Sequence, residues 1–182
     1  MSELAQDICL EGLTQSLTSL FEHYTNGEVD IRLLVGEEGL QSSELSEECQ
    51  LEFDLASSTI ELVGEGVRYF ICLVSPIKTV RGLCDGGAND PVDWIGELAN
   101  QLFGRFKNHL LEYGVDSQLG IPIASEGVQQ KCIACGDGSS TLEIKTPAGY
   151  VWAVFKPEVD PDLCWERGNA IATSEEGSIE LF

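Results

Sequence analysis

The stretch Asn89–Gly114, NDPVDWIGELANQLFGRFKNHLLEYG, constrains the fold most, because it predicts one long helix with defined ends. Asp90 is suited to the N-cap, and Pro91 to the first helical position, where the missing N–H of proline costs nothing. Asp93 favours the positive start of the helix, and Gly114 is typical of a helix stop. The sequence therefore predicts both ends of this helix.

The two sides of the predicted helix differ in chemistry. On a helical wheel, Asp93, Glu97, Asn100 and Gly104 gather on one side, which we expect to point at solvent or at a partner. The opposite side is apolar and carries Val92, Ile95, Leu98, Ala99, Leu102, Phe106, Leu110 and Tyr113.

Glu97 and Asn100 are three residues apart, so a carboxylate and an amide leave the same helical turn. A carboxylate can meet a lysine, and an amide can orient a water molecule for attack without changing its own protonation state. Gly104 leaves bare backbone one turn further on. This pattern indicates positioning chemistry on another molecule rather than nucleophile chemistry.

A family signature matches these residues. Asp93-x3-Glu97-x2-Asn100, followed by Pro122 after a strand-like stretch at Gln118–Ile121, resembles the motif of the CheC/CheX/FliY phosphatases, which remove phosphate from the chemotaxis response regulator CheY. The segments DWIGELANQLFGR and GIPIASEG look most like CheX, the type with a single working motif. The resemblance covers most of the chain and is most specific around these two segments.

The resemblance implies a mechanism and a partner. Glu97 would pair with a lysine of a phosphorylated CheY-like receiver domain, and Asn100 would hold a water molecule in line with the phosphoryl group. Mg²⁺ would come from the receiver, so no cofactor or metal of the protein's own is expected. Asp93, Gly104 and Pro122 would support the site. Proteins of the CheX type are homodimers, and we expect a homodimer here.

The rest of the pattern predicts an α/β (α+β) sandwich. Helix, strands, helix and strands follow one another, which favours a sheet with helices on one face. The resemblance implies the same CheC-like fold, a mostly antiparallel sheet with two long helices on one face. We expect a helix over about Glu3–Tyr24 and strands at Val29–Val35, Cys49–Leu55, Ile60–Val63, Tyr69–Val74, Gln118–Ala124, Val128–Ala134, Thr141–Lys145 and Tyr150–Phe155.

One departure from the family pattern concerns Ile77–Ala88. The family has a helix before the motif helix, but this segment is rich in glycine and lacks helical periodicity. We expect a loop there.

The predicted N-terminal helix contains a partial match to the motif. Asp7-x3-Glu11-x2-Thr14 aligns with the motif around Asn100 and suggests an internal pseudo-repeat. A threonine hydroxyl is too short to replace the amide, and no proline follows at the matching distance. We therefore expect Glu11 to be an exposed helix residue and the chain to be of the one-site type.

A third match, Asp162-x3-Glu166-x2-Asn169, is interpreted as coincidence. Gly168 interrupts it, and no apolar face continues beyond it.

Composition limits the classes of function. A formal net charge of −21 over 182 residues disfavours nucleic acid and anionic membranes as partners. A hydrophobic fraction of 43% suits one substantial core, and no apolar run is long enough to cross a bilayer, so a cytoplasmic protein is expected. We expect one phosphatase domain over residues 1–160 and an acidic tail over 161–182.

Two other functions stay open at this point. A non-catalytic receiver-binding adaptor, or a flagellar-switch module, could keep the fold without turnover. Cys132-x2-Cys135 could be half of a zinc site or a redox pair, completed by Cys164, His23 or His109. Seven cysteines without a secretion signal are better explained as reduced, buried thiols, and Cys9, Cys49, Cys72 and Cys84 lie in or near apolar runs.

Overall fold

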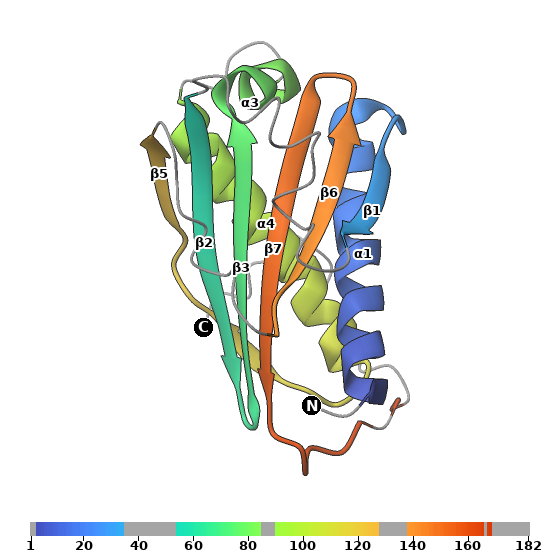
Figure 1. Cartoon of the computed structure of the whole chain (residues 1–182). Helices are drawn as coiled ribbons and strands as arrows, with labels where there is room; N and C mark the ends of the chain where they lie inside the picture. Colours follow the sequence, from blue (N-terminus) through green and yellow to red (C-terminus); the bar gives the residue numbers. More distant parts are fainter. Residues whose placement is uncertain (1–2, 35–53, 85–89, 128–137, 166, 169–182) are drawn as a thin grey trace, which may run out of the picture.

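In the described part of the chain, seven strands form one antiparallel sheet, and two long helices cover one of its faces (Figure 1). This computed structural model describes residues 3–34, 54–84, 90–127, 138–165 and 167–168. The predicted α+β sandwich is therefore confirmed. The elements are α1 (Glu3–Thr25), β1 (Asp30–Leu34), β2 (Leu55–Gly64), β3 (Val67–Pro76), α3 (Ile77–Leu83), α4 (Pro91–Leu111), β4 (Ser117–Leu119), β5 (Ile123–Gly127), β6 (Ser140–Thr146) and β7 (Gly149–Val159).

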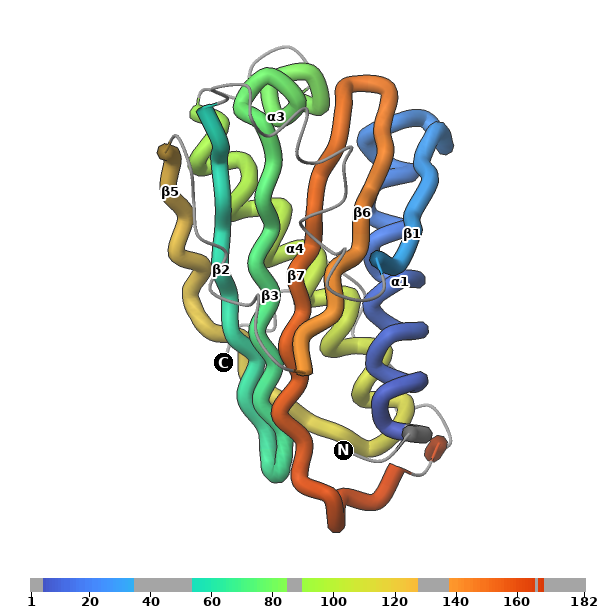
Figure 2. The backbone as a smooth tube through the Cα atoms, in the orientation of Figure 1, coloured from blue at the N-terminus to red at the C-terminus, as the bar shows by residue number. Residues whose placement is uncertain are grey.

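The strands lie in the order β1-β6-β7-β3-β2, and β4 and β5 share the outer edge of β2 (Figure 2). β4 pairs with β2 at Leu62–Gly64, and β5 pairs with it at Leu55–Thr59. The uninterrupted strand predicted over Gln118–Ala124 is therefore wrong. The Gly120 N–H still donates to the Glu61 carbonyl of β2 (2.8 Å), and the ladder is interrupted at residues 121–122, where Pro122 has no N–H to donate.

Aromatic rings fill the core between the sheet and the helices. Tyr69 of β3 is fully buried, stacks on Phe155 of β7 at 5.8 Å between ring centroids, and meets the edge of Phe106 of α4 at 5.4 Å. Leu13 and Leu17 of α1 are also fully buried in this core. Burial of these large side chains ties both long helices to the sheet.

α1 and α4 run antiparallel and touch along their length. Gly12 of α1 lies against His109 near the end of α4, whereas Tyr24 near the end of α1 bonds to Gln101 earlier in α4. A Cβ atom at position 12 would overlap with the His109 ring. Glycine therefore permits the close approach of the two helices at this end.

The loop predicted over Ile77–Ala88 is wrong for its first half, which forms the short helix α3. Thr79, Val80 and Leu83 are buried on one side of it. Gly82, which argued for a loop, lets α3 approach the turn between β6 and β7, because a Cβ there would lie 2.9 Å from the Cβ of Ala148. Tertiary packing thus outweighs the low helix propensity of glycine.

Two predicted strands lie wholly or mostly outside the described residues. Val128–Ala134 lies outside the described residues, and of Cys49–Leu55 only Asp54 and Leu55 are described, with Leu55 opening β2. Apart from the divided strand at Gln118–Ala124, the other strands and both long helices occur where predicted, with ends that differ by a few residues.

After β7, the described residues of the chain still contact the folded domain. Arg167 forms an ion pair with Glu112 beyond α4 (3.0 Å), and the Gly168 N–H donates to the Glu112 carbonyl (2.9 Å). Trp165 packs against the core. Residues 161–165 and 167–168 therefore lie against the folded domain, and the boundary at residue 160 stays a prediction.

A glycine pair tests the helix contact. Gly12→Ala should lower the free energy of unfolding by about 1–3 kcal/mol, because the new methyl group must displace His109. Gly104→Ala in α4 should instead raise it by about 0.5–1 kcal/mol, since a Cβ there meets nothing within 4 Å and alanine favours the helix. Urea unfolding measures both. Shifts of the same sign would contradict the close contact.

Alkaline pH should destabilise the fold through a buried pair. Burial raises the pKa of the Cys9 thiol from 9.0 to about 11, and burial also raises the pKa of Tyr69, whose hydroxyl accepts from Cys9 Sγ at 3.6 Å. The unfolded chain loses these protons first, so stability is retained below about pH 9 and falls as the pH rises towards 11. Urea titrations from pH 8 to 10.5 measure the slope. A Cys9→Ala, Tyr69→Phe double variant with the same slope would contradict this assignment.

Candidate active site

Helix α4 starts at a capped end. The Asp90 carboxylate accepts a hydrogen bond from the Val92 N–H (2.9 Å), Pro91 occupies the first helical position, and Asp93 lies exposed in the first turn. After the helix, Gly114 has a φ of +74°, the left-handed conformation that glycine adopts most easily. Both ends were predicted from the sequence, and both are confirmed.

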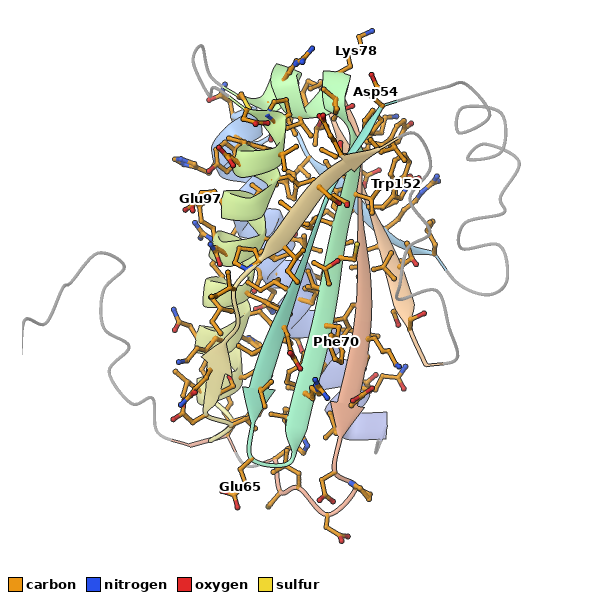
Figure 3. The ribbon with its side chains drawn as sticks, turned by 90° about the vertical axis from the view of Figure 1, so that its left-hand side faces the viewer. Asp54, Glu65, Phe70, Lys78, Glu97 and Trp152 are labelled. Atoms are coloured by element: carbon orange, nitrogen blue, oxygen red, sulfur yellow. The ribbon has the colours of Figure 1, made fainter. Side chains whose placement is uncertain are left out.

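The two faces of α4 separate largely as the helical wheel predicted, except that Val92 is half-buried and Tyr113 lies beyond the end of the helix. The face towards the sheet is buried, whereas Glu97 is exposed on the side turned away from the sheet (Figure 3). Asn100 is half-buried at the same turn, and Gly104 is half-exposed one turn further on. The buried residues are Ile95, Gly96, Leu98, Ala99, Leu102, Phe103, Phe106 and Leu110.

Glu97 has a hydrogen-bond partner that sequence reasoning missed. Nε2 of Gln101 donates to Oε1 of Glu97 (3.2 Å), and the amide oxygen of Gln101 lies 3.1 Å from the hydroxyl oxygen of Tyr24. The spacing of four residues between Glu97 and Gln101 was a signal for the first contact. The second contact joins residues 77 positions apart, so no local pattern could reveal it.

The backbone at Gly104, close to the motif, has free space around it. A Cβ at this position would meet nothing within 4 Å, so no packing inside the described chain requires glycine there. A helix glycine without a packing reason leaves room for close approach by another molecule.

Pro122 is half-buried between β4 and β5, on the edge that flanks α4. β5 touches the helix where Ala124 lies against Gly96, one turn before Asn100. Ile121 and Ile123 beside it are 88% and 75% exposed. The structure thus puts Pro122 on the strand edge next to the motif helix, with two exposed apolar side chains around it.

In the α1 copy of the motif, the side chain that matches Asn100 bonds to the backbone of its own helix. The Thr14 hydroxyl donates to the Leu10 carbonyl (2.7 Å), which is a bond within α1. Glu11 is exposed, as predicted, and accepts from Gln15 Nε2 (3.0 Å). Threonine at this position therefore serves the helix backbone and presents no amide to a partner.

The third copy of the pattern does not begin on a helix. Asp162 lies in a turn, and its N–H donates to the Asp160 carboxylate (2.9 Å). Glu166 and Asn169 lie outside the described residues.

No disulfide joins the described cysteines to one another. Cys9 and Cys72 are buried, Cys84 is half-buried and Cys164 is exposed, whereas the Cys132 and Cys135 pair lies outside the described residues. Within the described ranges, no three His, Cys, Asp or Glu side chains gather in a group that could hold a metal ion. The same ranges contain no helix long and apolar enough to span a bilayer.

Comparison with solved structures identifies the fold. The CheC-like superfamily protein from Shewanella sp. PV-4 matches with a TM-score of 0.65 and 17% identity, over 87% of this chain and 99% of that one. CheX from Vibrio vulnificus gives 0.62 and 16%, over 82% and 99%. A CheX–CheY–BeF3–Mg²⁺ complex from Borrelia burgdorferi gives 0.60 and 14%, over 82% and 97%. No protein-family model and no curated protein matches the chain.

The chain therefore has the CheC-like fold, as its motifs predicted. Within this fold, its structure resembles the CheX chemotaxis proteins over most of its length, at low sequence identity.

The cap of α4 can be tested directly. Asp90→Ala should lower the free energy of unfolding by about 0.5–2 kcal/mol, because the Val92 N–H loses its acceptor. Asp93→Asn keeps the cap and loses only a charge near the helix start, so it should cost about 0.3–1 kcal/mol. Urea unfolding at low salt compares the two. An Asp90→Ala variant as stable as the wild-type protein would contradict the capping role.

Proposed function

We propose that this protein is a phosphatase that hydrolyses the phosphoaspartate of a CheY-like receiver domain. The observation that carries the proposal is the pair Glu97 and Asn100 on one turn of α4, where Glu97 is exposed on the side away from the sheet (Figure 3) and Asn100 is half-buried beside it. The fold shared with CheX proteins, one of them solved together with CheY, supports the same partner class.

In the proposed reaction, Asn100 enters the receiver site and orients a water molecule. Its amide oxygen accepts from the water while its N–H donates to a phosphoryl oxygen, which places the water in line with the P–O bond to the aspartate. The bond from the water oxygen to phosphorus forms as the P–O bond to the aspartyl carboxylate breaks. The water proton leaves with inorganic phosphate. Mg²⁺ of the receiver supplies charge stabilisation on the phosphoryl group.

Glu97 is proposed to dock the helix. Its exposed carboxylate would form a charge-assisted hydrogen bond with a receiver lysine, which places α4 over the phosphoaspartate. Gly104 would let the receiver approach the helix backbone, Asp93 would support the helix start, and Pro122 would shape the adjoining edge. With a net charge of −21, the protein should prefer a receiver surface with a positive rim.

The proposal extends to assembly and location. We infer a homodimer in the cytosol, as the CheX resemblance implies. Sedimentation equilibrium at micromolar concentration tests it: the mass of two 19.8 kDa chains is expected, and the mass of one would contradict the dimer.

Asn100→Ala should abolish the activity. Loss of one positioning amide should reduce kcat by about 100-fold or more, with little change in the unfolding midpoint, because Asn100 is half-exposed. The assay follows phosphate release from a panel of phosphorylated receivers in Mg²⁺ buffer. Thr14→Ala, at the matching position of α1, is the control and should retain activity.

The outcomes separate the candidate functions. Normal turnover by Asn100→Ala would refute the assignment of this residue. Receiver binding by the wild-type protein without accelerated hydrolysis would favour the non-catalytic adaptor instead.

A further inference from the structure

We propose that Gln101 and Tyr24 are positioning residues that hold the Glu97 carboxylate ready for the receiver lysine. The proposal rests on the proposed function and adds two residues that lie outside the Glu97-x2-Asn100 motif. Gln101 follows Asn100 in α4, whereas Tyr24 comes from the end of α1, so the two long helices would cooperate at one site.

Two hydrogen bonds join α1 to Glu97. Nε2 of Gln101 donates to Oε1 of Glu97 (3.2 Å), and the Tyr24 hydroxyl oxygen lies 3.1 Å from Oε1 of Gln101. An ionised carboxylate only accepts hydrogen bonds, so the amide NH₂ must face Glu97. The amide oxygen is then left to accept from the Tyr24 O–H. The chemistry of the two ends therefore selects one orientation of the Gln101 amide.

Tyr24 is fixed by its ring. It is half-buried and packs against the core, and its ring meets Trp94 of α4 edge to face at 5.3 Å between centroids. The ring of its chain neighbour His23 also meets it edge to face, at 5.2 Å between centroids. Such aromatic contacts restrict the ring. The hydroxyl that reaches Gln101 is therefore anchored by the contact between the two helices.

The consequence for Glu97 is preorganisation. Glu97 is exposed, and a free glutamate side chain loses rotamer freedom when it is fixed in a complex, which weakens binding. The bond from Gln101 removes part of that loss before the receiver arrives. It uses one carboxylate oxygen, and the other can accept from a lysine ammonium group.

The α1 copy provides a matched control. Gln15 Nε2 donates to Glu11 Oε1 (3.0 Å) at the same spacing of four residues, and both side chains are exposed. The neighbouring Thr14 hydroxyl bonds within its own helix. A change at Gln15 therefore removes the same type of local bond without touching the proposed site.

The experiment measures kcat and KM for a phosphorylated CheY-like receiver, and the affinity for the same receiver loaded with beryllofluoride and Mg²⁺. The variants are Gln101→Met, Tyr24→Phe, their double variant and Gln15→Met, each with its thermal unfolding midpoint. Methionine keeps the length and helix propensity of glutamine but donates no hydrogen bond. Phenylalanine keeps the ring against Trp94.

We expect Gln101→Met to raise KM and weaken receiver affinity about 3- to 10-fold, with kcat within about twofold of wild type. Tyr24→Phe should have a smaller effect of the same kind. The double variant should match Gln101→Met, because Tyr24 acts through Gln101. Gln15→Met should leave both constants unchanged.

Three results would overturn the positioning role: an unchanged KM and affinity in Gln101→Met, a fall in kcat as large as that of Asn100→Ala, or an equal rise of KM in Gln15→Met. If the wild-type protein binds the receiver but does not turn it over, the proposed phosphatase function fails, and the affinities still decide the positioning role. Absence of binding by the wild-type protein would overturn both proposals.

Discussion

The burial of one face of α4 is the constraint on which the proposed site depends. Eight buried residues hold this face against the sheet and α1, and their helical spacing fixes the rotation of α4 about its axis. With that rotation fixed, Glu97 is exposed on the side away from the sheet (Figure 3), and Asn100 lies half-buried on the same turn. A shift of the core by one residue would turn the helix by about 100° and carry both side chains away from a docked partner.

α1 supports α4 in this arrangement. In the predicted pseudo-repeat, Thr14 of α1 corresponds to Asn100 of α4, and its hydroxyl bonds to its own helix backbone, whereas Asn100 is half-buried on α4. Gly12 brings the helices together at one end, and Tyr24 reaches across at the other. Under the proposed function, α4 carries the motif and α1 helps to position it.

The sequence predicted those features that depend on interactions between residues close together in the chain. The cap at Asp90 and the stop at Gly114 were predictable, because each acts within a few residues. The helix α3 was not, because Gly82 signals a loop in sequence and its reason, contact with Ala148, lies in tertiary structure. The role proposed for Gln101 was missed for the same reason, since its second partner is distant in sequence.

The central claim is that Asn100 positions a water molecule for hydrolysis of a receiver phosphoaspartate. The most direct test measures phosphate release when the receiver is in large excess over the protein, because a catalyst must turn over more than once. With one molecule of protein for about fifty molecules of continuously phosphorylated receiver, the account predicts many equivalents of phosphate per protein above the receiver's own rate, and none above that rate with Asn100→Ala. A wild-type rate equal to that of the receiver alone, across receivers that bind the protein, would contradict it.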